Sequence, residues 1–427
     1  MKSIQIGLVG IYVLLLHISY VYFISPDYSY MGFIYRHIPN AKVVAISMLY
    51  IILPILFTKK ELKKPSELVF WILYFIVYIP VVWVPNYLFD SIQLSLMYAN
   101  TLLLLCLLII GNVNHLPVIR ITPLRANKRM LRMIYIVSLF FFFIYIFKVS
   151  GGINLKPPID SEDIYDKRLA FRMKLTPVAG YIIQWLAKVW NPLLVAFGLV
   201  HRRYIFVFIG LVLQYLLYTV NGLKSTLLST ALLIIVYIAF KNNGRNFSIL
   251  FCLSLCSLLG ISIFLDFIYE QTYFSNLFAR RMIITPGLLT TYYIEFFSQH
   301  PKALLSYSIL ERFIDPVYEV SPPFIIGTEY FGRPQMAANA NMFADAFANF
   351  GYAGFIIYTL ILSGLLWVYD SLVQKETLRS FGIIIFVIPA WCLADTALTT
   401  TFITSGMIFI FMFMYLLLGT DQQKGAR

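Results

Sequence analysis

The sequence predicts an all-α polytopic integral membrane protein with about twelve transmembrane helices. Hydrophobic residues make up 60% of the chain, charged residues only 12%, and the mean hydropathy is +0.79. A soluble domain averages about 25% charged residues, so this chain has too few charges to cover a water-facing surface. Apolar runs of about 20 residues, the length of a bilayer-spanning helix, recur from one end to the other.

Each apolar run is expected to be a helix, because the backbone of a spanning segment must satisfy its own hydrogen bonds in lipid. The first run follows Lys2 and has no small-residue cleavage site after it, so it is interpreted as a retained span and not as a signal peptide. The predicted spans are 5–24, 41–57, 68–89, 92–111, 130–149, 178–200, 204–220, 225–240, 246–267, 344–369, 381–397 and 402–419. The whole chain, 1–427, is expected to form one membrane domain.

Basic residues concentrate in alternate short loops, and this pattern predicts the orientation. The short outer loops "NYLFDSIQ" and "ADTALTTT" contain no Lys or Arg, which places both termini in the cytoplasm. The same bias explains the net charge of +13 more simply than nucleic-acid binding does. The basic residues of the predicted inner loops and C-terminus are Lys59, Lys60, Lys63, Lys64, Arg120, Arg125, Lys128, Arg129, Arg132, Arg202, Arg203, Lys241, Arg245, Lys375, Arg379, Lys424 and Arg427.

Two long segments, 150–177 and 268–343, fall on the outer side in this topology. Long loops are usually functional or disordered, and the second one is too apolar and too helix-periodic for disorder. It is therefore expected to carry the active-site helices. The four cysteines lie inside apolar runs, and no Walker, Rossmann, HExxH or nucleophile-elbow motif occurs. The sequence thus predicts no metal site and no cofactor.

The larger outer segment contains a predicted helix after "ARRMIITP". Thr285 is a hydroxyl N-cap, Pro286 suits the first helical position, and an apolar face runs from Leu289 to Phe296. His300 and the proline after it end this helix, and "KALLSYSILERF" predicts another. Two amphipathic helices lying flat on the membrane surface would produce this pattern.

Arg280 and Arg281 stand directly before this predicted helix. A helix N-terminus favours anions, and guanidinium groups bind phosphate in a bidentate manner. The pair is therefore a candidate phosphate or pyrophosphate site at the outer membrane surface. Interfacial arginines that reach toward lipid headgroups would look the same, and the spacing does not separate the two interpretations.

Further basic residues fall on the outer side. Arg168 and Arg172 share a predicted helix face with Lys167 and Lys174 nearby, although neighbouring acidic residues would also suit a simple solvated face. Lys224 follows an Asn-Gly break at the outer end of a span, and its alternative is again contact with the headgroup region.

A second set of polar candidates lies within or beside the spans. Lys188 is near the middle of its span, where a charge costs roughly 2.5–3.5 kcal/mol, so it is expected to face the protein interior in a functional or paired role. Asn339 or Asn341 is expected to cap the tenth span. Asp345 and Asn349 share one helix face at outer depth, and Asp345 is a site candidate or a structural ion-pair partner.

Three stretches carry a resemblance to a known family: "RMIITPGLLTTYYIEFFSQHPKALLSYSIL", "IGTEYF" and "ANANMFADAFANFGYAGFII". Together they resemble the Wzy-type polymerases of O-antigen and capsule synthesis, which join lipid-linked oligosaccharide repeat units. "IYDKRLAFR" and "NGLKSTLLS" are similar to upstream segments of that family. The resemblance is most specific over 280–355, and elsewhere it rests on topology.

This resemblance implies a metal-independent, GT-C-like membrane glycosyltransferase in the bacterial cytoplasmic membrane, acting on its outer face. Such an enzyme moves the growing glycan from undecaprenyl pyrophosphate onto the next lipid-linked repeat unit, and a chain-length regulator is an implied partner. On this basis the pyrophosphate is assigned to Arg280 and Arg281, with Arg168, Arg172 and Lys224 as further contributors. The catalytic base or the sugar contacts are assigned to His300, Glu295 and Asp345. The alternatives are an O-antigen ligase and a flippase or transporter of lipid-linked oligosaccharides.

Overall fold

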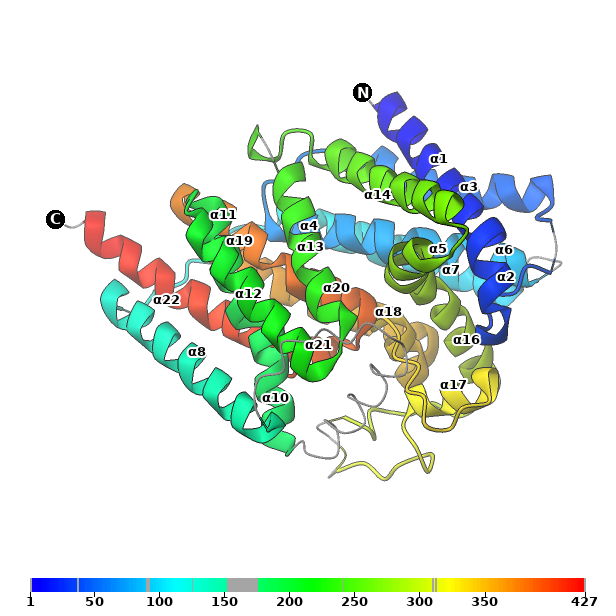
Figure 1. The fold of residues 1–427 in the computed structure, drawn as a ribbon. Helices are drawn as coiled ribbons and strands as arrows, with labels where there is room; N and C mark the ends of the chain where they lie inside the picture. Colours follow the sequence, from blue (N-terminus) through cyan, green and yellow to red (C-terminus); the bar gives the residue numbers. More distant parts are fainter. Residues whose placement is uncertain are drawn as a thin grey trace.

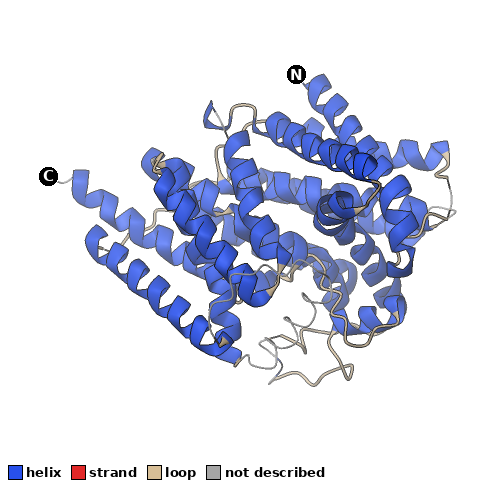
Figure 2. Ribbon diagram, viewed as in Figure 1, coloured by secondary structure: helices blue, strands red, loops and turns tan. Residues whose placement is uncertain are grey.

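The computed structural model describes residues 2–36, 38–89, 93–124, 126–151, 176–240, 242–308, 311 and 313–425. Over these residues the regular structure is entirely helical, and no strand occurs among them (Figures 1 and 2). The predicted all-α fold class is therefore confirmed for the described part of the chain.

Most of the described helices follow one another with short connections, and longer ones separate η4 from α8, α16 from α17 and α17 from α18. Labels with η mark short stretches of 3-10 or π-helix, and η1, η3, η5 and η7 are π-helical. Before residue 152 the helices are α1 (Lys2–Ile18), η1 (Ser19–Ile24), α2 (Ser25–Tyr28), η2 (Ser29–Met31), α3 (Ala41–Phe57), α4 (Pro65–Leu73), η3 (Tyr74–Tyr78), α5 (Ile79–Trp83), α6 (Pro85–Leu88), α7 (Leu94–Asn112), η4 (Val113–His115) and α8 (Lys128–Ser150). After residue 175 they are α10 (Pro177–Trp185), η5 (Leu186–Trp190), α11 (Asn191–Val200), α12 (Tyr204–Asn221), α13 (Lys224–Ala239), η6 (Asn242–Gly244), α14 (Phe247–Tyr269), α15 (Tyr273–Ser275), η7 (Asn276–Ile284), α16 (Thr285–Gln299), α17 (Pro322–Phe331), α18 (Met342–Leu372), α19 (Glu376–Ile385), α20 (Val387–Asp395), α21 (Leu398–Phe402) and α22 (Met407–Gly425).

Helices lie at all of the ranges that the sequence predicts as spans. Nine helical segments of the described chain are long and apolar enough to cross a membrane. Shorter apolar helices, Ala41–Phe57, Lys224–Ala239 and Met407–Thr420, lie at the other predicted ranges. This arrangement fits a multi-pass membrane protein.

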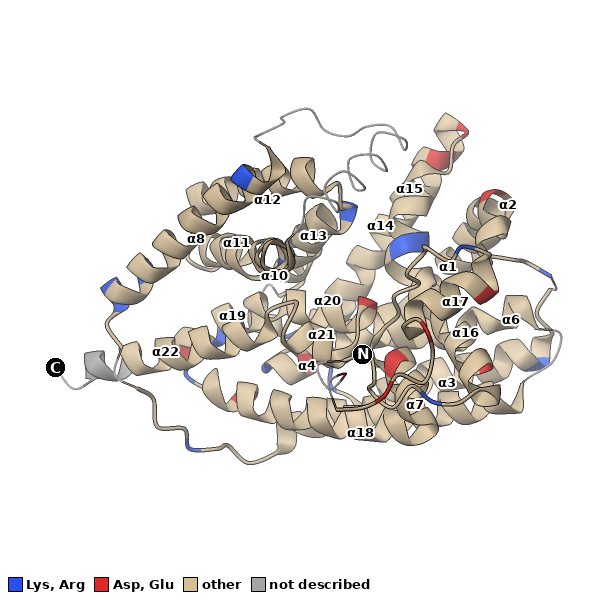
Figure 3. Ribbon diagram, turned by 90° about the horizontal axis from the view of Figure 1, so that it is seen from below, with Lys and Arg blue, Asp and Glu red and all other residues tan. Residues whose placement is uncertain are grey.

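Peripheral helices expose apolar side chains, as helices surrounded by lipid do. Phe140 and Phe141 on α8 are 68% and 62% exposed, and Phe264 on α14 is 62% exposed. Charged residues are sparse along the described helices (Figure 3). Water would solvate such surfaces poorly, whereas hydrocarbon would not, so the helix periphery supports a bilayer as the solvent of this fold.

One span lies at the centre of the bundle. The segment Pro65–Leu88 is formed by α4, η3, α5 and α6. Its apolar 18-residue stretch is completely buried inside the protein. α4 packs against α7 and α20, and α5 packs against α16. α16 in turn packs against α18, so the segment that the sequence predicts to be the larger outer one contributes a helix to the core of the protein.

The expectation of two helices lying flat on the membrane is wrong in two respects. α16 buries residues around its whole circumference, including Thr290 and Thr291 as well as the predicted apolar face, so it has no free face to lay on lipid. The stretch 301–308 is turn and irregular structure, not the second helix. The reason is tertiary packing: α5 and α18 enclose α16 on several sides.

α18 is broken at Gly351, and residues just before this break hold the stretch that follows α16. Gly351 has φ +61° and ψ −143° inside this helix, a conformation that glycine tolerates best. Before the break, the Ala348 carbonyl accepts a 2.9 Å hydrogen bond from the Ala303 amide. The Asn349 side-chain oxygen accepts one of 2.7 Å from the Leu305 amide. The stretch after α16 is thus tied to α18 by one backbone and one side-chain hydrogen bond.

The described chain ends lie apart from the outer segment. In Figure 1, α1 begins at the top and α22 ends at the left, whereas 301–341 lies at the bottom. The cavities described next lie between the helices α10, α13, α16, α18 and α20.

Candidate functional site

A large cavity lies between helices that are far apart in the sequence. Its volume is about 1120 Å³, and its walls come from α10, η5, α12, α13, α16, α17, α18, α20 and α21 together with Leu305, Tyr307, Ser308, Glu311 and Phe313. Its lining is mixed, with hydroxyl, amide and charged groups among aromatic and aliphatic ones. The charged residues that the sequence singled out at this cavity are Lys188 and Asp345.

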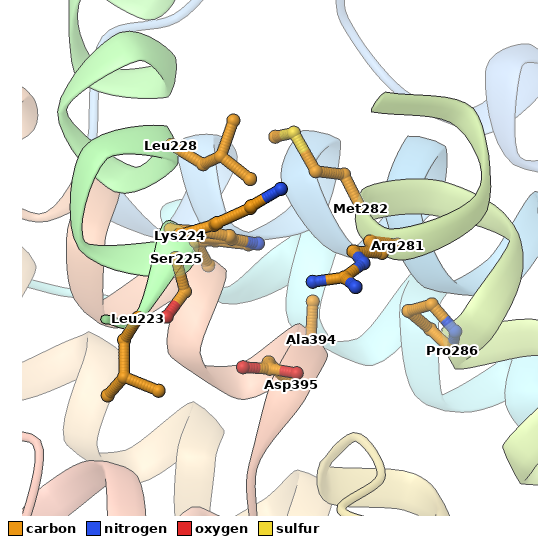
Figure 4. A pocket seen from close by; sticks show the side chains of 10 residues that line it. Leu223, Lys224, Ser225, Leu228, Arg281, Met282, Pro286, Ala394 and Asp395 are labelled. Atoms are coloured by element: carbon orange, nitrogen blue, oxygen red, sulfur yellow. The ribbon is translucent and has the colours of Figure 1, made fainter. Parts of the chain in front are cut away.

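A small pocket adjoins the large cavity. It has a volume of about 160 Å³ and is lined by Lys224, Arg281 and Asp395 among apolar neighbours (Figure 4). Leu223, Ser225, Trp391 and Asp395 line both spaces, so the two are adjacent and share this wall. Two cations and one carboxylate from three different helices therefore meet in a space of roughly five water volumes.

Arg281 lies on η7, the π-helical segment before α16, and points into the small pocket (Figure 4). It forms no ion pair or hydrogen bond with another described residue. π-Helical stretches are rare and often mark functional sites. The basic charge of Arg281 is therefore available to a ligand.

α16 begins at the predicted Thr285, with Pro286 in its first turn, but the predicted N-cap role of Thr285 is wrong. η7 runs directly into α16, and the Thr285 amide donates to the Arg280 carbonyl across a π turn. The Thr285 hydroxyl donates to the same carbonyl at 2.6 Å and does not cap a helix. Pro286 is tolerated in the first turn of α16 because proline has no backbone N–H that would need an acceptor there. No free helix N-terminus therefore exists at this point to bind an anion.

Arg280 faces the opposite way from Arg281, into the protein. It is 5% exposed, its guanidinium lies 4.3 Å from the Tyr28 ring centroid, and its Nε donates to the Asn276 side chain at 2.6 Å. Burial lowers the pKa of Arg280 to about 10, and the neighbouring Arg281 charge contributes to this. Arg280 lines neither space and packs η7 against the N-terminal helices.

Lys224 is the first residue of α13 and lines the small pocket. Its ammonium group lies 5.1 Å from the Tyr273 ring centroid. No side chain caps α13, so the partial positive charge of this helix end adds to that of Lys224. The real helix N-terminus of the site is therefore that of α13 and not that of α16.

Lys188 lies on the π-helical segment η5 and lines the large cavity, as its expected inward orientation requires. Its Nζ donates to the Ser405 hydroxyl at 3.0 Å. It also interacts electrostatically with Asp395. Ser405, in the connection before α22, is 4% exposed, so Lys188 is paired with buried polar groups across the cavity wall.

Asp345 and Asn349 both lie on the cavity wall, near the start of α18. The Tyr358 hydroxyl donates to Asp345 Oδ2 at 2.9 Å. Asn341 is the N-cap of α18, since its side-chain oxygen accepts from the amides of Phe343 and Ala344 at 3.0 and 3.2 Å. Asn339 is exposed and lines the cavity instead.

Two predicted catalytic residues lie away from both spaces. His300 follows α16, stacks on Phe296 at 4.0 Å between centroids, and its Nδ1 lies 2.8 Å from the Phe296 carbonyl oxygen. Partial burial raises the pKa of Glu295, whereas a hydrogen bond with Tyr330 and the charge of Arg36 oppose this shift. Neither His300 nor Glu295 lines the large cavity or the small pocket. Arg168 and Arg172 lie outside the described residues.

Asp395 is the site residue that sequence reasoning missed. It ends α20 and lines both spaces. One signal could have identified it: Asp395 is the only charged residue between Arg379 and Asp421. The loop that contains Asp395 lacks Lys and Arg and so indicates orientation, but its one carboxylate is not among the predicted site residues.

Metal ligands do not cluster in the described part of the chain, where no group of three or more His, Cys, Asp or Glu residues could hold an ion. The site is therefore described by its cations, its carboxylates and its cavity. The sequence matches no protein-family model and no curated protein, and the fold matches no solved structure.

Proposed function

We propose that this protein is a membrane glycosyltransferase that polymerises lipid-linked oligosaccharide repeat units. It transfers the growing glycan from undecaprenyl pyrophosphate to the next lipid-linked unit, as in O-antigen or capsule synthesis. The observation that carries the proposal is a small cationic pocket that adjoins a large cavity of mixed lining inside a bundle of apolar helices. The sequence resemblance over 280–355 points in the same direction.

The small pocket suits the diphosphate of the donor. Arg281 and Lys224 face it without an ion-pair partner among the described residues, and the α13 terminus adds partial positive charge. Such groups stabilise the negative charge that develops as the pyrophosphate leaves. Arg280 is assigned a packing role instead, because its guanidinium is buried against aromatic rings.

The large cavity suits the saccharide part of the substrate. Its volume of about 1120 Å³ exceeds the roughly 300–1,000 Å³ typical of small-molecule pockets, so it has room for several sugar rings. Tyr181 and Phe313 offer exposed aromatic faces, and Asn339, Asn349 and Asp345 offer polar groups. Asp345 therefore remains a candidate for sugar contacts, whereas His300 and Glu295 do not lie where a sugar in this cavity would reach them.

The proposed location is the bacterial cytoplasmic membrane, with both termini in the cytoplasm and the active site on the outer face. The alternating distribution of basic loops supports this orientation. A chain-length regulator is a proposed partner on the basis of resemblance alone.

The direct test is polymerisation in vitro with a defined undecaprenyl-pyrophosphate repeat unit. The Arg281→Ala variant removes a charge-assisted phosphate contact worth roughly 2–3 kcal/mol, so kcat/KM should fall about 30- to 150-fold. Arg333→Ala is the matched control, because Arg333 lies 5.8 Å from the Tyr30 ring centroid and lines neither space. In cells, Arg281→Ala should shorten the polysaccharide. Wild-type chain lengths in both Arg281→Ala and Lys224→Ala strains would remove the leaving-group role.

One observation favours a second candidate, a flippase or transporter of the same lipid-linked oligosaccharides. Lys188, Asp345 and Asp395 belong to candidate membrane spans and face a common cavity, as charges along a transport path would. Purified protein in liposomes separates the two activities. Extension of lipid-linked units without their movement across the bilayer supports the polymerase, and movement without extension supports the transporter.

An O-antigen ligase differs from a polymerase only in its acceptor. A strain that lacks the protein distinguishes these two enzymes. Without a polymerase, single repeat units still reach the surface core, whereas without a ligase none do.

A further inference from the structure

Asp395 occupies a position that no other carboxylate in the described residues shares, because it lines both the small pocket and the large cavity. In Figure 4 its carboxylate lies across the small pocket from the Arg281 guanidinium and the Lys224 side chain. Asp395 is therefore at the junction of a cationic space and a polar one.

The carboxylate of Asp395 is not used to hold the fold together. It forms no hydrogen bond or ion pair with another described residue, and Lys188 is the opposite charge with which it interacts. Other acids here have structural partners: the Asp266 carboxylate accepts from the amides of Phe274 and Ser275 at 2.8 and 2.5 Å. An acid without such partners at a cavity junction is free to contact a ligand.

We propose that Asp395 marks the position of the reacting bond, with the donor diphosphate in the small pocket, the saccharides in the large cavity, and the Asp395 carboxylate accepting the proton of the acceptor hydroxyl. This inference rests on the proposed function. It adds the placement of the two halves of the donor and the identity of the catalytic base.

The step balances without another reactant. The acceptor hydroxyl oxygen attacks the anomeric carbon of the donor glycan and forms the new glycosidic bond. The bond from that carbon to the pyrophosphate oxygen breaks, and its electron pair leaves on the pyrophosphate, where Arg281 and Lys224 stabilise it. The hydroxyl proton passes to Asp395 and then to water.

Asp345 is less suited to this role. Its Oδ2 already accepts the Tyr358 hydroxyl, and it lines the large cavity but not the small pocket. A base must lie within reach of the hydroxyl that attacks beside the leaving group. Among the described carboxylates at these cavities, Asp395 alone meets the leaving-group pocket.

The position of Asp395 has a second consequence. Its negative charge shares a pocket of about 160 Å³ with the pyrophosphate, so it repels the product as well as serving the acceptor. Replacing it with asparagine should therefore slow turnover and tighten product binding at the same time. A residue that only supports the fold would not produce these opposite effects.

The experiment measures two quantities on full-length protein in detergent micelles: binding of undecaprenyl pyrophosphate and turnover of a lipid-linked repeat unit. For Asp395→Asn, we expect kcat to fall about 100-fold or more and undecaprenyl pyrophosphate to bind about tenfold tighter. Asp27→Asn is the matched control, because Asp27 is exposed, lines neither space and accepts the Thr272 hydroxyl at 2.7 Å. It should leave both quantities unchanged.

A double variant tests the simpler role of neutralising Lys188. If Asp395 only balanced that charge, Lys188→Met together with Asp395→Asn would recover activity, and this recovery would overturn the inference. Unchanged product binding or wild-type turnover in Asp395→Asn would overturn it too. If the proposed function is wrong, the wild-type protein itself will make no polymer. The comparison of undecaprenyl pyrophosphate binding between the wild type and Asp395→Asn still tests where the diphosphate lies in that case.

Discussion

Replacing Gly287 with alanine tests whether α16 is a core helix or a helix lying on the membrane surface. The two arrangements predict opposite signs. On an exposed helix, Gly→Ala stabilises a protein by about 0.4–1 kcal/mol, because alanine loses less backbone entropy on folding. In the structure, a Cβ at Gly287 would lie 2.5 Å from the backbone carbon and oxygen of Pro80 on α5.

The magnitude follows from what must move. Backbone atoms of α5 cannot swing aside as a flexible side chain could, and Pro80 belongs to the completely buried central span. Overpacking of this kind costs typically 1–3 kcal/mol, which outweighs the gain in helix propensity. Gly287→Ala should therefore destabilise the protein by about 1–2 kcal/mol.

The assay is thermal unfolding of the purified protein in detergent at a fixed scan rate, since unfolding of membrane proteins is often irreversible. Gly260→Ala on α14 is the matched control, because no atom lies within 4 Å of the added Cβ. It should match or exceed the wild-type apparent Tm, whereas Gly287→Ala should fall below it. An apparent Tm for Gly287→Ala at or above the wild-type value would refute the packing of α16 against α5.

Two further predictions concern stability. Asn341→Ala leaves the amides of Phe343 and Ala344 without their acceptor and should cost about 1–2 kcal/mol, measured as a lower apparent Tm, whereas Asn339→Ala should not. Glu295→Gln should reduce the pH dependence of stability. Burial raises the pKa of Glu295, so folding favours its protonated form; the associated stability is complete below the ordinary carboxyl pKa and is lost as the pH rises through the raised value. The variant should therefore gain more apparent Tm over wild type at pH 7 than at pH 4, and an equal difference at both pH values would contradict the raised pKa of Glu295.

The span pattern was predictable because its cause is local. A run of apolar side chains with no internal charge requires a helix in lipid whatever its neighbours do, so helices lie at every predicted range. The N-cap role of Asn341 and the inward orientation of Lys188 follow from equally local arguments, and both are confirmed.

The interior of the outer segment was not predictable in this way. The Thr285–Pro286 pair has the composition of a helix start, and α16 does begin there, but it continues directly from the π-helical η7 and so has no free N-terminus. The apolar face of α16 suggested lipid, whereas its partners are α5 and α18, whose contacts depend on tertiary packing. Similarly, no spacing in the sequence indicates that Lys224, Arg281 and Asp395 meet, since they come from three helices.

The adjacent arginines show most clearly why a sequence pair is not a structural pair. Successive residues of an α-helix point in directions about 100° apart, and those of a π-helix also diverge, so neighbouring side chains do not face one ligand. On η7 this geometry sends Arg280 toward Tyr28 and Arg281 toward Lys224. A two-arginine clamp would need positions three or four apart on one helix, or, as here, cations from separate helices. The partner of Arg281 at the pocket is therefore Lys224, which is far from it in sequence, and a diphosphate bound there would bridge η7 and α13.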